Sequence, residues 1–84
     1  MFSLIWQPNS QLMFIGMWMT AGAAMRRRIA QAVQRIILQL SADPQNAGES
    51  RDRGRRVMRE APVGVLFKVD AKRMRVRILQ IWEY

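Results

Sequence analysis

The chain has 84 residues, half of them apolar, and its 14 Lys and Arg against six Asp and Glu give a net charge of +8. This length allows one small domain over residues 1–84, and the apolar content excludes a disordered tail. Cys and His are both absent, which excludes disulfide scaffolds, thiolate or imidazole metal sites and histidine-based catalysis. We therefore expect no metal and no cofactor, and the lack of Cys suits a cytoplasmic protein.

The positive charge is carried almost entirely by arginine. Only Lys68 and Lys72 among the 14 cations are lysines. The planar guanidinium group of arginine binds phosphate and carboxylate oxygens through two parallel hydrogen bonds. The composition therefore predicts a phosphate-rich or acidic protein partner, in preference to a basic surface that is merely solvated.

The N-terminal third predicts a strand followed by an unusually apolar helix. "MFSLIW" (Met1–Trp6) is the strand, and "QPNS" ends it. Asn9 or Ser10 is expected to cap a helix through "QLMFIGMWMT", which is apolar nearly all round. The apolar run over 12–25 is shorter than the roughly 20 residues that span a bilayer. We expect a helix that is buried or covered by a partner, in preference to a membrane segment.

A second helix and three strands follow. "AGAA" (Ala21–Ala24) predicts a break, and Asp43-Pro44 ends the next helix because the residue before proline avoids helical geometry. Ser41–Arg56 is polar and predicts a loop. The strands are expected at Arg56–Glu60, Val63–Asp70 and from Met74 to Trp82. The apolar stripe expected to pack the second helix on the core consists of Met25, Ile29, Ala32, Val33, Ile36, Ile37 and Leu40.

The C-terminal segment "MRVRILQIWEY" alternates arginines with apolar residues, so it predicts a strand that belongs to the sheet. Met74, Val76 and Ile78 should face the helices, with Arg75 and Arg77 pointing outward. The alternation then fails, because Leu79 falls on the arginine side. A β-bulge or a second covered patch near residue 79 would account for this change. Trp82 is expected to be a core or rim aromatic in preference to a base-stacking one.

These elements predict an α+β fold, β-α-α-β-β-β, with two helices packed on one face of a small antiparallel sheet. In this order, the stretches "RIAQAVQRIILQLSADPQNAGESR", "RRVMREAPVGVLFKVD" and "RVRILQIWEY" resemble the RelE/ParE superfamily of type II toxin–antitoxin toxins, which includes plasmid stabilisation proteins. The resemblance covers most of the chain from Trp18 onward. It rests on the combination of a helix ending in "DP", a "GESR" loop and the two patterned strands.

The resemblance implies a concave basic surface and, for the RelE branch, metal-independent cleavage of mRNA in the ribosome. Such chemistry needs a group that activates the 2'-hydroxyl, cations that hold the charge on phosphorus, and an acid for the leaving group. The residues expected to be catalytic are Arg55, Arg56, Arg77 and Tyr84, and those expected to bind nucleic acid are Arg51, Arg53, Arg59, Lys68 and Arg75.

Two departures weaken the nuclease reading. Glu83 stands where a His is expected before the terminal Tyr, and Gly64 stands about where several active nucleases carry an Arg. The ParE branch, which poisons DNA gyrase by binding, is therefore a second expectation. A small structural or nucleic-acid-binding protein that kept the fold without toxicity is a third.

The expected partner is an acidic antitoxin. Its apolar residues should contact the first helix, at Leu12, Ile15 and Met19, and its carboxylates should pair with arginines. Methionine-rich surfaces adapt to a partner's shape, and the chain has seven Met. The target would be ribosome-bound mRNA or gyrase, and homo-oligomer formation is left open.

Overall fold

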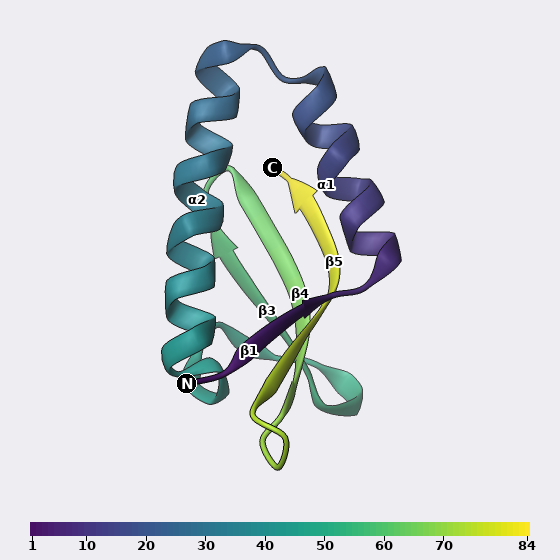
Figure 1. The fold of residues 1–84 in the computed structure, drawn as a ribbon, viewed down its shortest axis with the longest axis vertical. Helices are drawn as coiled ribbons and strands as arrows, with labels where there is room; N and C mark the ends of the chain where they lie inside the picture. The colour runs from purple at the N-terminus through teal and green to yellow at the C-terminus, as the bar shows by residue number, and fades with distance from the viewer.

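The computed structural model describes all 84 residues and places two helices on one face of a five-stranded sheet (Figure 1). In chain order the elements are β1 (Ser3–Trp6), α1 (Pro8–Thr20), α2 (Ala23–Ala42), β2 (Glu49–Ser50), β3 (Arg55–Glu60), β4 (Val63–Asp70) and β5 (Arg75–Glu83). Two short 3₁₀ turns, at Pro44–Asn46 and Asp52–Gly54, flank β2. The predicted α+β class and its element order are confirmed.

The sheet is mixed, with strand order β1-β5-β4-β3-β2. The meander of β3, β4 and β5 is antiparallel, as predicted. β1 instead pairs in parallel with β5, and the two-residue β2 extends the other edge of the sheet inside the predicted loop. Alternating sequence patterns identify strands but carry no information on their direction, which explains why the parallel pair was not predicted.

The helix boundaries follow local chemistry. α1 begins at Pro8, whose missing N–H and fixed φ suit the first helical position. The predicted cap at Asn9 or Ser10 is wrong, because Gln7 is the N-cap residue and no side chain caps the helix. Ser10 is fully buried, and its hydroxyl is within hydrogen-bond distance of the carbonyl oxygens of Gln7 (2.7 Å) and Ile78 (3.0 Å). α1 is thereby tied to β5.

The core lies between α2 and the sheet. Ile29, Ala32, Ile36 and Leu40 of α2 are buried, as the three- and four-residue spacing predicted. Ile37 is an exception, because 38% of it is exposed. The sheet contributes fully buried side chains to the same cluster, namely Val63, Val65, Phe67, Val76, Ile78 and Ile81.

A β-bulge in β5 keeps the C-terminal half of this strand in the core. Phe67 pairs with Ile78 while Leu66 pairs with Gln80, so Leu79 is the extra residue. The predicted irregularity at residue 79 is confirmed, and it turns Ile81 back toward the helices. The prediction that Met74 begins this strand is wrong, because Met74 lies in the β4–β5 turn with a φ of 54°.

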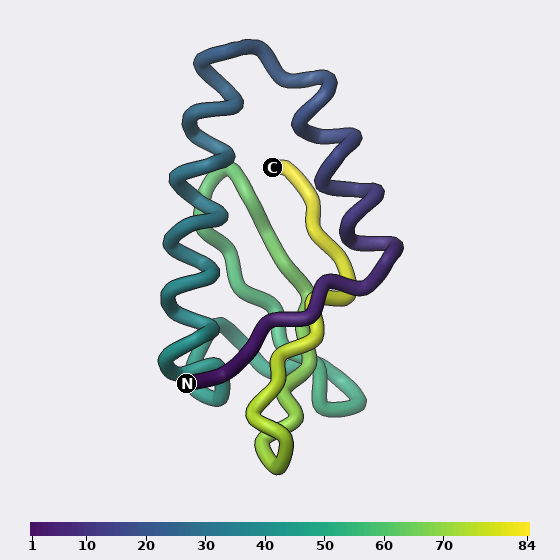
Figure 2. Tube along the Cα trace, viewed as in Figure 1, coloured from purple at the N-terminus to yellow at the C-terminus, as the bar shows by residue number.

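The helix pair diverges from its connecting loop and extends beyond the end of the sheet (Figure 1). α1 packs on β5, whereas α2 lies over β3, β4 and β1. The chain trace in Figure 2 places the N-terminus beside the end of α2, where the Phe2 N–H donates to the Ser41 carbonyl at 2.8 Å. No helix is both long enough and apolar enough to cross a bilayer.

Candidate functional site: a basic sheet face and an apolar helix cleft

The face of the sheet opposite the helices carries a row of cations. Lys68 of β4 pairs with Arg55 of β3 on one side and with Arg77 of β5 on the other. Paired residues on neighbouring strands project to the same face, and the next pair along, Phe67 with Ile78, is in the core. We call this surface the basic face and define it by Arg55, Arg59, Lys68, Arg75 and Arg77.

The basic face contains a groove of about 340 Å³, here called the outer groove. Val57 and Leu66, a cross-strand pair, form its apolar floor. Polar and aromatic side chains form the rest of its lining, namely Arg51, Asp52, Arg55, Gln80 and Trp82. Arg51 is paired with Glu49 at 3.2 Å in an exposed contact. The groove therefore combines guanidinium groups, a planar aromatic side chain and an apolar floor.

Trp82 is half-buried and lies on the outer face, not in the core. Its partner across the strands is Gly64, and the indole occupies the space above that glycine. A Cβ atom at Gly64 would lie 2.5 to 2.6 Å from Cε2, Cζ2 and Nε1 of the ring. The Arg expected here in related nucleases would therefore collide with Trp82.

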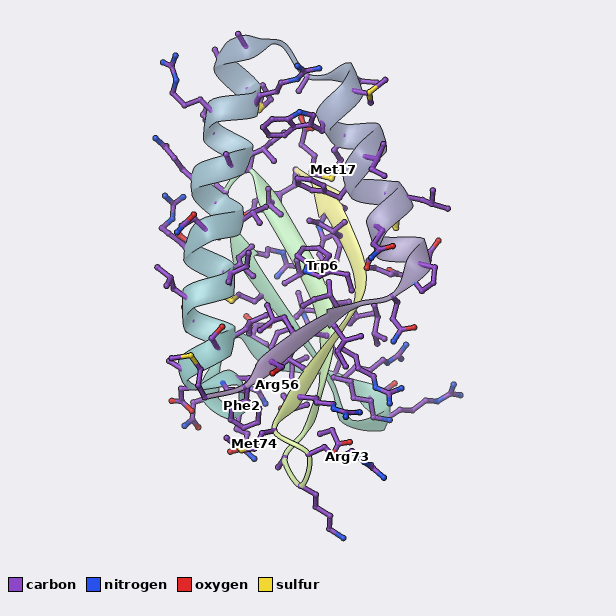
Figure 3. The ribbon with its side chains drawn as sticks, in the orientation of Figure 1. Phe2, Trp6, Met17, Arg56, Arg73 and Met74 are labelled. Atoms are coloured by element: carbon purple, nitrogen blue, oxygen red, sulfur yellow. The ribbon has the colours of Figure 1, made fainter.

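Arg56 is placed differently from the other expected catalytic arginines. It was expected to be catalytic together with Arg55 and Arg77, but it pairs with Phe67, whose side chain is in the core, so it lies on the opposite face of the sheet from those two arginines. Its Nε donates to the carbonyl of Ala47 at 2.8 Å, and its two terminal nitrogens donate to Ser50 Oγ at 2.8 Å and to the Gly48 carbonyl at 3.2 Å. Figure 3 labels Arg56 near β1, and its pairing with Phe67 places it on the helix side of the sheet. The three hydrogen bonds of Arg56 therefore stabilise the loop that precedes β3.

Tyr84 lies at the opposite end of the sheet from Arg77. It is 56% exposed, and its N–H donates to the Pro62 carbonyl at 3.0 Å. At about 3.3 Å per strand residue, its backbone is roughly 20 Å from that of Arg77. The structure therefore brings Arg55 and Arg77 together but does not bring Tyr84 to them. Arg59, which pairs with Gly64, is at the Tyr84 end.

The other expected nucleic-acid-binding residues divide by location. Lys68 and Arg75 are exposed on strands of the basic face, and Arg51 lines the outer groove. Arg53 lies in the 3₁₀ turn before β3, with a φ of 63°.

Near the β4–β5 turn, a hydrogen bond from the Arg73 side chain holds the pKa of the Asp70 carboxyl below its ordinary value. No three metal-ligating side chains lie together anywhere in the chain.

On the helix side, an apolar cleft of about 430 Å³ separates α1 from α2. Figure 3 shows Trp6 and Met17 in the region between the two helices. The cleft is lined by Phe14, Ile15, Trp18, Met19, Ala30, Val33, Gln34 and Ile37. Arg26 stacks over the Trp18 ring at 5.5 Å. We refer to this feature as the helix cleft.

The expected partner-binding residues of α1 are all exposed, Leu12 and Met19 at 70% and Ile15 at 54%. Ile15 and Met19 line the helix cleft, and Leu12 does not. Ile37, expected in the core, lines it as well.

The resemblance implied a concave basic surface, but the sequence did not identify Val57, Leu66 and Trp82 as its lining, although it contained one signal for this place. A glycine inside a strand often marks the close approach of another group, and Gly64 interrupts an otherwise bulky strand. The floor residues, Val57 and Leu66, gave no such signal, because exposed-face apolar residues look like core residues in a sequence.

Solved structures of toxins share this architecture from end to end. The toxin–antitoxin complex RelBE2 from Mycobacterium tuberculosis matches with a TM-score of 0.76, at 16% identity, over 99% of this chain and 98% of that one. The chain has the RelE/ParE toxin fold. The chromosomal ParDE toxin–antitoxin system of P. aeruginosa also matches this chain, with a TM-score of 0.66 at 21% identity, over 99% of this chain and 96% of that one.

The isolated RelE toxin of E. coli matches with a TM-score of 0.65, at 12% identity, over 99% of this chain and 84% of that one. No protein-family model and no curated protein sequence matches the chain. The RelE/ParE fold is thus supported by three-dimensional shape at identities where sequence comparison finds nothing.

Proposed function

We propose that this chain is the toxin of a type II toxin–antitoxin pair, and that it acts on RNA through its basic face. The observation that carries the proposal is the row of Arg55, Lys68 and Arg77 on a RelE/ParE fold. Like charges directly opposite one another destabilise a sheet, and an anionic ligand removes that repulsion. Gyrase poisoning is the second candidate, supported by the match to a ParDE system.

The proposed catalytic contribution comes from Arg55 and Arg77, whose guanidinium groups would stabilise charge on the reacting phosphate. The roughly 20 Å between the backbones of Arg77 and Tyr84 argues against a shared centre with the Tyr84 hydroxyl. Arg56 is proposed to contribute indirectly, because its hydrogen bonds hold the loop before β3 in place. Metal-independent RNA cleavage needs an acid and a base in addition to these cations, and Glu83 and Tyr84, at the far end of β5, are too distant from Arg55 and Arg77 to supply them.

The test is expression of the chain alone and together with its neighbouring gene, followed by mapping of mRNA ends. We expect growth arrest, new mRNA ends, and relief on co-expression of an acidic neighbour. Arg55→Ala and Arg77→Ala should each lower cleavage about 10²–10³-fold, whereas Tyr84→Phe should leave it unchanged. Growth arrest without new mRNA ends would favour gyrase, and no arrest at all would favour a non-toxic binding protein.

We propose that the antitoxin lays apolar side chains of an amphipathic helix into the helix cleft. Exposed apolar patches of this kind mark interfaces, and the exposed Arg27 and Arg28 on α2 suit acidic flanks on the partner. Ile15→Glu and Met19→Glu should abolish neutralisation by the antitoxin. Leu12→Glu is the control, because Leu12 is as exposed as Met19 but lies outside the cleft. Equal effects of all three substitutions would contradict this docking site.

The contact should also be only partly sensitive to salt. Ion pairs on the surface are screened over about 8–10 Å at physiological ionic strength, but burial of apolar surface is not. Complete dissociation of the pair at moderate salt would therefore refute a mainly apolar contact.

A further inference from the structure

The three tryptophans of the chain occupy two different environments. Trp6 and Trp18 each pack against Phe14 on the helix side, with ring centroids 6.3 and 6.0 Å apart, and Trp18 also lies under Arg26. Trp82 alone lies on the basic face, half-buried in the lining of the outer groove. No aromatic ring or arginine side chain stacks on it.

Gly64 provides the space that the Trp82 indole occupies. Its backbone does not need a glycine, because its φ is outside the positive range in which other residues are strained. A glycine inside a strand weakens the strand, since it costs entropy and packs nothing. Glycine nevertheless stands at position 64, where a Cβ atom would collide with the Trp82 ring. The indole is therefore supported from below by the backbone of β4.

The surroundings of Trp82 suit a nucleotide, whose flat base is attached to a negatively charged sugar-phosphate backbone. The apolar floor of Val57 and Leu66 continues from the ring along the sheet, and the guanidinium groups of Arg51 and Arg55 are at the far end of the outer groove. Asp52 adds one negative charge and Arg51 is paired with Glu49, so the positive charge available to a ligand comes from Arg55 and from the neighbouring cations Lys68 and Arg77. Along β3, the row of Arg59 and Trp82 is about 13 Å from the row of Arg55 and Arg77.

We propose that Trp82 is a stacking platform for one base of single-stranded RNA, and that phosphates beside this base bind the cations of the basic face. This inference rests on the proposed RNA target and assigns one specificity-determining residue to it. Every base has a π-face, so stacking tolerates sequence, but the larger purine ring gains more contact. A purine is therefore preferred on Trp82. The residue binds and orients the RNA and takes no part in the proton transfers.

The experiment measures binding of the whole protein to short fluorescent RNA oligonucleotides that carry a central purine, a central pyrimidine or a central abasic site. Trp82→Leu keeps an apolar side chain but removes the ring, and Trp82→Phe keeps a smaller ring. Gly64→Ala keeps Trp82 but displaces its indole, because the added Cβ would occupy the space of the ring. Lys72→Gln, in the exposed β4–β5 turn, is the control, and thermal unfolding of each variant checks the fold.

We expect Trp82→Leu to weaken binding of the purine oligonucleotide about 5- to 150-fold, the usual effect of losing one stacked base. Trp82→Phe should lose less, and Gly64→Ala should follow Trp82→Leu. Binding of the abasic oligonucleotide should be the same in all variants. The dependence of affinity on salt should not change, because the phosphate contacts remain.

Equal losses on abasic and purine RNA would overturn the inference, as would the absence of RNA binding by the wild-type protein. Growth arrest is a separate readout. A wild-type chain that arrests growth but binds abasic and purine RNA equally refutes the stacking platform and leaves the proposed toxin function standing. A chain that discriminates these RNAs without arresting growth supports the platform and refutes the toxin.

Discussion

Arg56→Ala should destabilise the fold by about 1.5–3 kcal/mol, and this loss should come from the loop before β3. Of the three acceptors of Arg56, the carbonyl of Ala47 belongs to a fully buried residue, and a charged hydrogen bond to such a group contributes about 1.5–3 kcal/mol. The bonds to Ser50 and Gly48 are exposed, so water replaces them at little cost. For a chain of this size, the total free energy of unfolding is only about 4–12 kcal/mol.

Urea unfolding monitored by circular dichroism measures this loss directly, and a shift in melting temperature of about 4–8 °C per kcal/mol accompanies it. Arg55→Ala is the control, because its guanidinium makes one exposed bond to the Asp52 carbonyl and should cost less than about 0.5 kcal/mol. Arg56→Lys should recover part of the loss, since it keeps one donor. If Arg56→Ala and Arg55→Ala unfold alike, the structural role of Arg56 is refuted.

Three further outcomes follow from local geometry. Gly48→Ala should destabilise the fold by more than about 1 kcal/mol, because φ is +66° and a Cβ would lie 2.0 Å from the Val57 carbonyl oxygen; an unchanged urea midpoint would contradict this. Gly16→Ala should instead stabilise it by about 0.5–1 kcal/mol, since nothing lies within 4 Å of that position on α1, and a lowered midpoint would refute the reasoning. The Asp70 carboxyl should stabilise the fold at neutral pH and lose this contribution as pH falls through its lowered folded-state pKa; Arg73→Ala should raise that pKa in an NMR titration, and an unmoved pKa would exclude Arg73 as its cause.

Features that depend on local periodicity were predicted from the sequence. The stripe of Ile29, Ile36 and Leu40 identified the core face of α2, because one helical face can be buried only by side chains three and four residues apart. The phase error after Ile78 identified the bulge at Leu79, because a strand with one buried face must return its apolar residues to that face.

Features that depend on distant residues were not predicted. The parallel pairing of β1 with β5 joins segments about seventy residues apart, and no local pattern specifies it. The same limit applies to the functional surfaces. Arginines were assigned by residue type. Arg55 and Arg56 are neighbours in β3 and so project to opposite faces, and the strand register shows that Arg56 is the one on the core side. The contact between Trp82 and Gly64 could not be predicted, because it depends on both the β4–β5 register and the bulge in β5.

The position of β5 in the sheet has a consequence for biosynthesis. β5 lies between β1 and β4, so β1 has no neighbour in the sheet until residues 75–83 are available. A nascent chain still holding those residues inside the ribosome can form α1 and α2, but it leaves the apolar residues of both helices without the central strand that covers them. The basic row through Lys68 also lacks Arg77 at that stage. Completion of the fold therefore waits for β5, and the assembled sheet surface forms only after residues 75–83 have emerged from the ribosome.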